Sequence, residues 1–307
     1  MMLFGSLSQQ LHKQTGSTPP EKKDASSVPA YNDACSGPAY IDSQRIKLSF
    51  YNVVAFVFAM AINGTSNTFS RATQAEIAEE WDVRIMPAGW AFSIWGIIYL
   101  FLFSIVAYQA VPSNSLPLRS NAVIFDDIGK LFVVNMVANG LWLACFGFNT
   151  PVAFFIALLD IIVLLASGVK ILMIISRSEV TNFERFLIGG GFTLYNGWVT
   201  AATILNVSFF LKGCGVGKDE EWESGVTCAV LVVALFVYSI VSYLERNPCY
   251  GLVFLWPLLA IKGEQKEYTD IENCCMALII IDAVAMVGLM MFCYSENKKR
   301  VECNERI

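Results

Sequence analysis

The chain has 307 residues, of which 55% are hydrophobic and 15% are charged, and its formal net charge is −5. A soluble protein carries about 25% charged residues to cover its surface, so this composition excludes two ordinary soluble domains. The charges also cluster, because residues 131–159, 186–211, 224–244 and 247–261 contain no Asp, Glu, Lys or Arg. A membrane-spanning helix needs about 20 apolar residues. The sequence therefore predicts an all-α, polytopic membrane protein.

The other counts exclude several kinds of site. An acidic chain without a block of Lys and Arg lacks the electrostatic footprint of a nucleic-acid-binding protein. The single histidine, His12, lies in a polar tail, which argues against a metal site or an axially ligated haem inside the membrane. The nine cysteines are scattered and form no Cys-x-x-Cys pair, so we interpret them as small apolar residues.

In chain order, residues 1–47 form a polar tail rich in Ser, Thr, Pro and mixed charge, which is typical of disorder. A short charged tail covers residues 295–307 at the other end. Between the tails we predict about eight transmembrane helices, near residues 48–68, 89–111, 130–148, 151–176, 186–211, 225–244, 247–261 and 274–294. The segment 247–261 is short and contains Pro257, so a re-entrant path is the alternative to a full crossing.

Residues 70–86 connect the first two predicted helices and carry their own helical signal. The pattern Thr73-x-x-Glu76 is that of a capping box, and Ile77, Trp81 and Ile85 recur every four residues. This spacing predicts a short interfacial helix.

The distribution of Lys and Arg predicts the orientation. Segments that a cytoplasmic N-terminus would place inside hold more Lys and Arg than the outer ones, so we predict that the N-terminus is cytoplasmic.

Aromatic and amide residues concentrate in the predicted second, third and fifth helices. Trp95 and Tyr99 are one helical turn apart, and Asn135, Asn139 and Trp142 share one helix face. Buried amides beside Trp and Tyr form a pocket that can stack on a flat apolar ligand and fix its polar edge. The alternative is structural, with amides that hydrogen-bond between helices and a belt of interfacial Trp.

The predicted fifth helix also carries a stripe of small residues. Gly189, Thr193, Gly197 and Ala201 recur every four residues, a spacing that lets another backbone approach closely. Such a stripe serves either packing within the chain or a homodimer interface. If the second alternative applies, the protein could also be a purely structural membrane subunit.

Two acidic residues, Asp160 and Asp282, lie inside predicted helices. Each costs about 2.5–3.5 kcal/mol to insert into the membrane, so each needs a partner or a wet cavity. One hypothesis is therefore a proton-coupled secondary transporter that uses Asp160 or Asp282. Their surroundings, LLDII and IIDAV, do not match those of an intramembrane aspartyl protease, and nothing in these residues requires catalysis.

Three motifs together resemble one known family. They are PAGWAFSIWGIIY (residues 87–99), NMVANGLWLACFG (135–147) and TLYNGWVTAATILN (193–206). Their order and their helix positions are similar to those of the tryptophan-rich sensory protein and translocator protein family, also called the peripheral-type benzodiazepine receptors. The resemblance covers residues 48–211 as a five-helix bundle. The additional helices of residues 212–294 resemble those of longer microbial relatives.

The resemblance implies a bundle that binds tetrapyrroles such as porphyrins, and in animal relatives sterols, in a pocket under the first loop. The Tyr that the proposed cholesterol motif requires is missing after Asn206, which leaves sterol binding open. The expected role is to bind, sense or transport a hydrophobic planar molecule, without catalysis and without a metal site. A porphyrin or haem-type ligand would be held non-covalently.

The pocket residues that the motifs and the amide pattern predict are Trp90, Trp95, Tyr99, Asn139, Trp142, Asn196, Trp198 and Asn206. We expect the indole rings to stack on the ligand, and Tyr99 and the amides to hold its polar edge.

Overall fold

The computed structural model describes residues 38–72, 74–109, 127–178, 180–216 and 220–304. The chain divides into two compact units, residues 1–42 and 43–307, and everything below concerns the second unit. Among the described residues every regular element is a helix, which confirms the predicted all-helical class. The predicted Thr73 capping residue lies outside the described residues.

The helices cover the predicted hydrophobic segments, but two of them extend into the predicted tails. Helix α1 begins at Pro38, inside the tail predicted for residues 1–47, and α12 continues to Asn304, through most of the tail predicted for residues 295–307. In chain order they are α1 (Pro38–Phe69), α2 (Gln74–Trp81), η1 (Gly89–Ser93), α3 (Ile94–Gln109), α5 (Leu131–Phe146), α6 (Pro151–Arg177), α7 (Asn182–Glu184), the π-helical η4 (Arg185–Gly190), α8 (Gly191–Gly213), α9 (Glu220–Leu244), α10 (Pro248–Leu252), α11 (Leu255–Glu264) and α12 (Thr269–Asn304). The short helix predicted within residues 70–86 is α2, whose Ile77 is completely buried.

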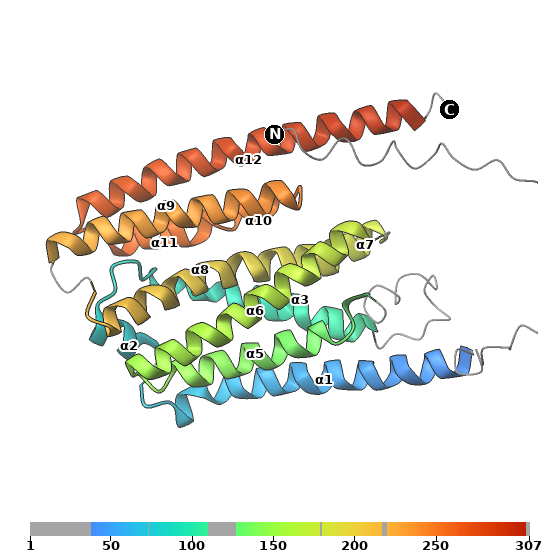
Figure 1. The fold of residues 1–307 in the computed structure, drawn as a ribbon, viewed down its shortest axis with the longest axis horizontal. Coiled ribbons are helices and arrows are strands. Elements are labelled where there is room, and N and C mark those ends of the chain that lie inside the picture. The colour runs from blue at the N-terminus through green and yellow to red at the C-terminus, as the bar shows by residue number, and fades with distance from the viewer. Residues whose placement is uncertain (1–37, 73, 110–126, 179, 217–219, 305–307) are drawn as a thin grey trace, which may run out of the picture. The chain divides into compact units, whose positions relative to one another are not determined.

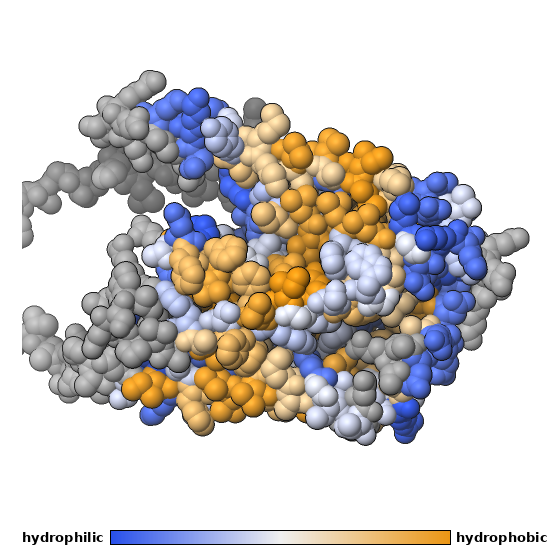
Figure 2. Space-filling view, turned by 180° about the vertical axis from the view of Figure 1, so that it is seen from behind, coloured by the Kyte–Doolittle hydropathy of each residue, from blue (hydrophilic) through white to orange (hydrophobic). Residues whose placement is uncertain are grey.

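Six helices in the described residues are long and apolar enough to cross a membrane, and α5 is a shorter apolar helix. Many large apolar side chains on these helices face outward, for example Leu100, Val152, Val233 and Met291. Soluble proteins rarely expose so much contiguous apolar surface, so these side chains face lipid. Figure 2 shows apolar residues over the middle of one face and hydrophilic residues toward both ends.

The helices lie side by side and alternate in direction. Figure 1 shows α12 along one edge, then α9 with α10 and α11, then α8, and finally α5 and α1 along the opposite edge. The most extensive contacts join α5 to α6 and α6 to α8, and α12 packs on α9, α10 and α11. Helix α8 therefore lies in the interior. It contacts α3 and α6 in the first half of the bundle, which comprises α1 to α6, and α9 and α10 in the second half, which comprises α9 to α12.

The predicted seventh segment is two helices, α10 and α11, with a break at Val253 and Phe254. Pro257 falls in the first turn of α11, where its missing N–H would have no helical partner in any case. The segment passes from one end of the bundle to the other. Asn247 binds the Thr193 side chain near the start of α8, whereas Gln265 donates to the Met86 carbonyl at the opposite end.

Local sequence signals explain how α6 begins. The Thr150 side chain accepts a hydrogen bond from the Ala153 amide at 3.1 Å, and Pro151 occupies the first helical position. Asn149 turns the chain from α5 into α6 with a φ of 53°, which Asn tolerates better than most residues. Its side chain accepts a hydrogen bond from the Trp81 indole at 2.6 Å. The turn thus fixes the end of α2 as well.

The small-residue stripe of α8 packs within the chain. A Cβ atom at Gly197 would lie 2.7 Å from the Cβ atom of Val253, and Tyr238 of α9 donates a hydrogen bond to the Gly197 carbonyl. Thr193 is buried under Asn247. The surface predicted as a possible homodimer interface is therefore covered at Thr193 and Gly197, and the intrachain alternative fits the contacts.

Gly197→Ala should destabilise the protein by about 1–3 kcal/mol, because the added methyl group overpacks the contact with Val253. The measurement is thermal unfolding in detergent. Gly288→Ala in α12 is the matched control, since its Cβ would meet nothing within 4 Å. Equal stability of the two variants would contradict the close approach of α10 to α8.

Candidate ligand-binding cavity

A cavity lies between the two halves of the bundle. Its walls come from the segment before η1, from α3, α5 and α8, and from α9 and α11. The lining residues are Ile85, Met86, Pro87, Phe92, Trp95, Trp142, Phe146, Trp198, Ala201, Ala202, Ile204, Leu205, Asn206, Phe209, Leu231, Ala234, Phe254, Pro257 and Ile261. The cavity volume is about 50 Å³. The cavity is thus a small, apolar slot.

Aromatic rings form the core of the wall. Trp95 stacks on Tyr99 with ring centroids 5.3 Å apart, and its centroid lies 6.1 Å from those of Trp142 and Tyr195. Such offset and edge-to-face pairs are favourable arrangements of aromatic rings. The predicted aromatic cluster of the second, third and fifth helices is therefore assembled around one point.

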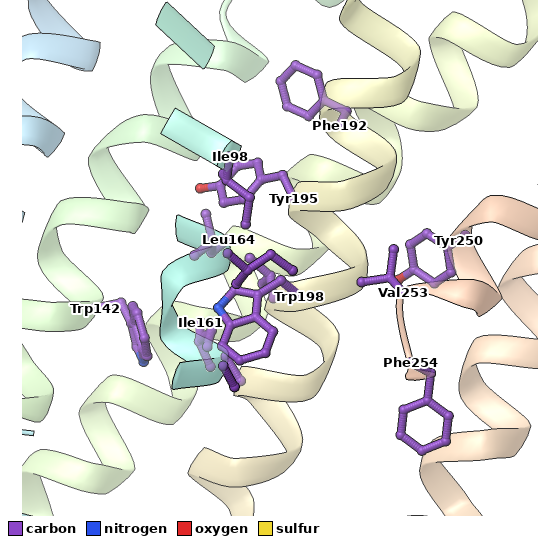
Figure 3. Packing of buried hydrophobic residues seen from close by; sticks show 14 of the residues in the cluster. Ile98, Trp142, Ile161, Leu164, Phe192, Tyr195, Trp198, Tyr250, Val253 and Phe254 are labelled. Atoms are coloured by element: carbon purple, nitrogen blue, oxygen red, sulfur yellow. The ribbon is translucent and has the colours of Figure 1, made fainter. Parts of the chain in front are cut away.

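The indole N–H groups of the wall have different surroundings. Trp142 Nε1 donates to Asn206 Oδ1 at 3.2 Å, and Asn206 Nδ2 in turn donates to the Ala202 carbonyl. Trp198 is 3% exposed, and its Nε1 has no hydrogen-bond partner among the described residues. In Figure 3 the Trp198 and Trp142 rings project from their helices into the space that separates α5 from α8. Trp198 thus presents an unused donor beside the cavity.

A polar network joins four helices next to the aromatic wall. Asn63 of α1 donates to the Tyr99 hydroxyl at 2.6 Å and to Asn139 Oδ1 at 2.7 Å. Asn139 then donates to the Tyr195 hydroxyl at 2.8 Å. Tyr99 and Asn139, both predicted as ligand anchors, are thus engaged with protein groups and hold the rings of the wall in place. The pattern of residues had not indicated Asn63.

Of the eight predicted pocket residues, Tyr99 and Asn139 stand behind the lining, and Trp90 and Asn196 also do not line the cavity. Trp90 is 49% exposed and packs edge-on against Trp256 at 4.9 Å. Asn196 is completely buried against α6, where a Cβ at Gly168 would collide with its Oδ1 atom. Its Nδ2 donates to the Phe192 carbonyl one turn earlier. Asn196 therefore contributes to helix packing in this structure.

The helices beyond α8 supply a wall that the motifs did not predict. Leu231 and Ala234 come from α9, and Phe254, Pro257 and Ile261 come from the α10–α11 segment. Figure 3 shows Val253 directed toward α8, and the same segment carries Phe254. A hydrogen bond from the Trp256 indole to the Ala91 carbonyl at 2.8 Å ties α11 to η1. Sequence patterns missed these residues because most are aliphatic and carry no chemical signature.

Residues 82–88, the roof segment, cover one end of the cavity. The segment begins at Asp82, whose φ of 42° ends α2, and it places Ile85, Met86 and Pro87 in the lining. The Ala88 amide donates to the Ala260 carbonyl of α11 at 3.3 Å. The roof segment is thus attached to the α11 wall.

Charged groups fasten the roof segment to α9. Arg84 is 5% exposed, and its Nε lies 3.5 Å from Glu223, which also pairs with Lys212 at 2.8 Å. A terminal nitrogen of Arg84 donates to Ser224 Oγ at 2.8 Å, and the guanidinium lies 4.0 Å from the centre of the Tyr268 ring. Stacking and forked hydrogen bonding are the contacts that Arg makes better than Lys.

The two membrane acids lie outside the cavity lining. Asp160 of α6 is half-buried, with one carboxylate oxygen that has no hydrogen-bond partner among the described residues. Asp282 of α12 is completely buried, and neither of its oxygens has such a partner.

The fold and the cavity define a polytopic helical membrane protein with an aromatic cavity between its two halves. A family model described as TSPO-like protein matches residues 49–291, so the chain belongs to the TSPO-like protein family and the predicted resemblance is confirmed. No curated protein and no solved structure matches the chain significantly. The matched range includes α9, α10, α11 and most of α12, so the helices that close the cavity fall within the family pattern.

Glu223→Gln should lower the stability of the protein by ~1–3 kcal/mol, because it removes the charged partner that Glu223 supplies to the buried Arg84 guanidinium and to Lys212. Thermal unfolding and the rate of proteolysis near the roof segment would measure the effect. Glu302→Gln is the control, since the Glu302 pair with Lys298 is exposed and contributes little. If the two variants unfold alike, Glu223 does not fasten the roof segment.

Proposed function

We propose that the cavity binds a hydrophobic planar small molecule of the tetrapyrrole class, and that the protein binds, senses or transports this ligand without catalysing a reaction. The observation that carries the proposal is the wall of Trp95, Trp142 and Trp198, in which the Trp198 N–H has no partner among the described residues. The indoles supply stacking surfaces, and Trp198 and Asn206 supply polar contacts for one edge of the ligand. The membership of the chain in the TSPO-like family supports this ligand class.

The size of the cavity adds a condition to this proposal. Sites for drug-sized ligands enclose roughly 300–1,000 Å³, whereas only about 50 Å³ is open here. A planar macrocycle can therefore enter only when side chains or the roof segment move. The structure corresponds to the closed, unliganded state in this proposal. A porphyrin would be held by stacking and amide contacts, and a sterol is the alternative ligand for so apolar a lining.

The proposed topology has eight passes, with α10 and α11 together as the seventh. This segment reaches from Thr193 at one end of the bundle to Met86 at the other, which favours a crossing over a re-entrant path. Both termini then lie on one side. The cytoplasm is the side we propose, because Lys and Arg are more numerous there.

Trp95→Ala and Trp142→Ala should each weaken protoporphyrin binding about tenfold, because each removes one stacking surface. Titration of the purified protein with protoporphyrin IX, followed by tryptophan fluorescence, measures the affinity.

Trp222→Ala is the matched control, because Trp222 is 74% exposed and does not line the cavity. Its affinity should equal that of the wild type. Quenching that does not saturate, or that responds equally in all three variants, would reject the cavity as the binding site.

A second candidate function is proton-coupled transport, and the environment of Asp282 is the observation that favours it. The Asp282 carboxylate is completely buried and has no hydrogen-bond partner in the described part of the chain. Its charged form is therefore costly, so Asp282 is suited to carry a proton. Intramembrane carboxylates of this kind form proton relays in pumps and transporters.

Asp282→Asn should abolish uptake of protoporphyrin driven by a pH gradient across liposomes, while saturable binding remains. Asp160→Asn is the control, since Asp160 is only half-buried and should leave the dependence on the gradient unchanged. Binding without any gradient-driven uptake in the wild type would reject the transport hypothesis. The cavity proposal would survive that result.

A further inference from the structure

Two open crevices adjoin at the end of α8 that is opposite to the aromatic cavity. The first lies among α6, η4, α8 and the turn before α10, and the second lies among η4, that turn and the end of α12. Arg185 and Arg246 line both of them. The two crevices have volumes of about 430 and 590 Å³, which are far larger than that of the aromatic cavity. A molecular group of considerable size can therefore reach both arginines.

Within the described part of the chain, neither guanidinium forms a hydrogen bond or an ion pair. Arg246 only lies over the Phe292 ring, 5.4 Å from its centre. Two acids also line the crevices, but both contact other groups. Glu245 accepts a hydrogen bond from Ser176 at 2.8 Å, and Glu296 lies 3.7 Å from the ammonium group of Lys299. Two cations that face a common space without a bonded anion attract an anionic ligand.

The backbone fixes the position of Arg246. Its φ of 48° is uncommon for a residue with a side chain. The next residue holds the turn in place, because the Asn247 amide donates to the Ser242 carbonyl and the Asn247 side chain donates to Thr193. The turn therefore holds Arg246 at the mouth of both crevices before any ligand arrives, which lowers the cost of binding.

The walls of the first crevice are amphipathic. Leu172, Ile175, Leu194 and Val253 line it below the arginines. Lys130 and Arg177 lie at the same end of the bundle, where α5 begins and α6 ends. An anionic head with an apolar chain matches this combination, because the head meets the arginines while the chain lies along the apolar residues.

The two adjoining crevices lined by Arg185 and Arg246 are called the arginine crevice below. We propose that the arginine crevice binds the phosphate headgroup of an anionic phospholipid, with one acyl chain along the apolar wall of the first crevice. Arg is suited to this contact, since its planar fork donates parallel hydrogen bonds to phosphate oxygens. The site is separate from the aromatic cavity, and the proposal does not depend on the ligand of that cavity.

The test is native mass spectrometry of the full chain in detergent, titrated with phosphatidylglycerol or phosphatidylcholine. The wild type should retain phosphatidylglycerol in preference to phosphatidylcholine. Arg185→Gln and Arg246→Gln should each reduce that preference about fivefold, as expected for one cation near an anionic lipid. Arg246→Lys keeps the charge and should lose less than Arg246→Gln. Tryptophan fluorescence of each variant shows whether the fold is intact.

Arg177→Gln is the matched control, because Arg177 is exposed at the same end but lines neither crevice. It should retain the preference of the wild type. An equal loss in this variant would overturn the proposal in favour of general surface charge. Inorganic phosphate that binds at the arginines and displaces the lipid completely would also overturn it, in favour of a site for free phosphate.

Discussion

The close approach of α10 to α8 at Gly197 is the contact on which the rest of the architecture depends. A side chain at position 197 would collide with Val253, so only glycine allows the two segments to meet there. Tyr238 binds the carbonyl of the same glycine and brings α9 to the same point. Because Phe254 and Pro257 follow Val253 directly, this contact places them in the cavity wall. The cavity is thus a product of all the helices, and a bundle of the first five alone would leave it open on one side.

The pairing of polar groups inside the bundle reflects a requirement that lipid imposes on every membrane protein. A polar group in hydrocarbon must find its partner inside the protein. Asn63, Tyr99, Asn139 and Tyr195 hydrogen-bond to one another across four helices and orient the rings of the aromatic wall. Buried groups that have no partner among the described residues, such as the Trp198 N–H, are therefore informative. An unpaired polar group in this setting marks a place where a ligand or a proton can bind.

The length of the hydrophobic segments and the spacing of the charges predicted the helices well, because a helix that spans lipid must be apolar along its whole length. The cavity was harder to predict from the sequence. Asn63 bonds to residues 36 and 76 positions away, and no local spacing reveals such partners. Asn196 shares a helix with Trp198 but faces α6, because periodicity gives relative directions and packing decides which face meets which neighbour. The break before Pro257 could be read from the sequence, but its contact with the cavity could not.

The cavity is too small for a planar macrocycle, so part of its wall must move when such a ligand enters, and the contacts indicate which part. Separating α8 from α10 would break the hydrogen bond between Thr200 and Tyr250, which is buried in the bundle and has no water to replace it. The roof segment is held by Arg84, Glu223 and Lys212 near the end of the bundle, where water can solvate these charges once they separate. Opening at the roof segment is therefore the less costly path. The aromatic cavity then opens at the end where α2 lies, and the arginine crevice faces the opposite end.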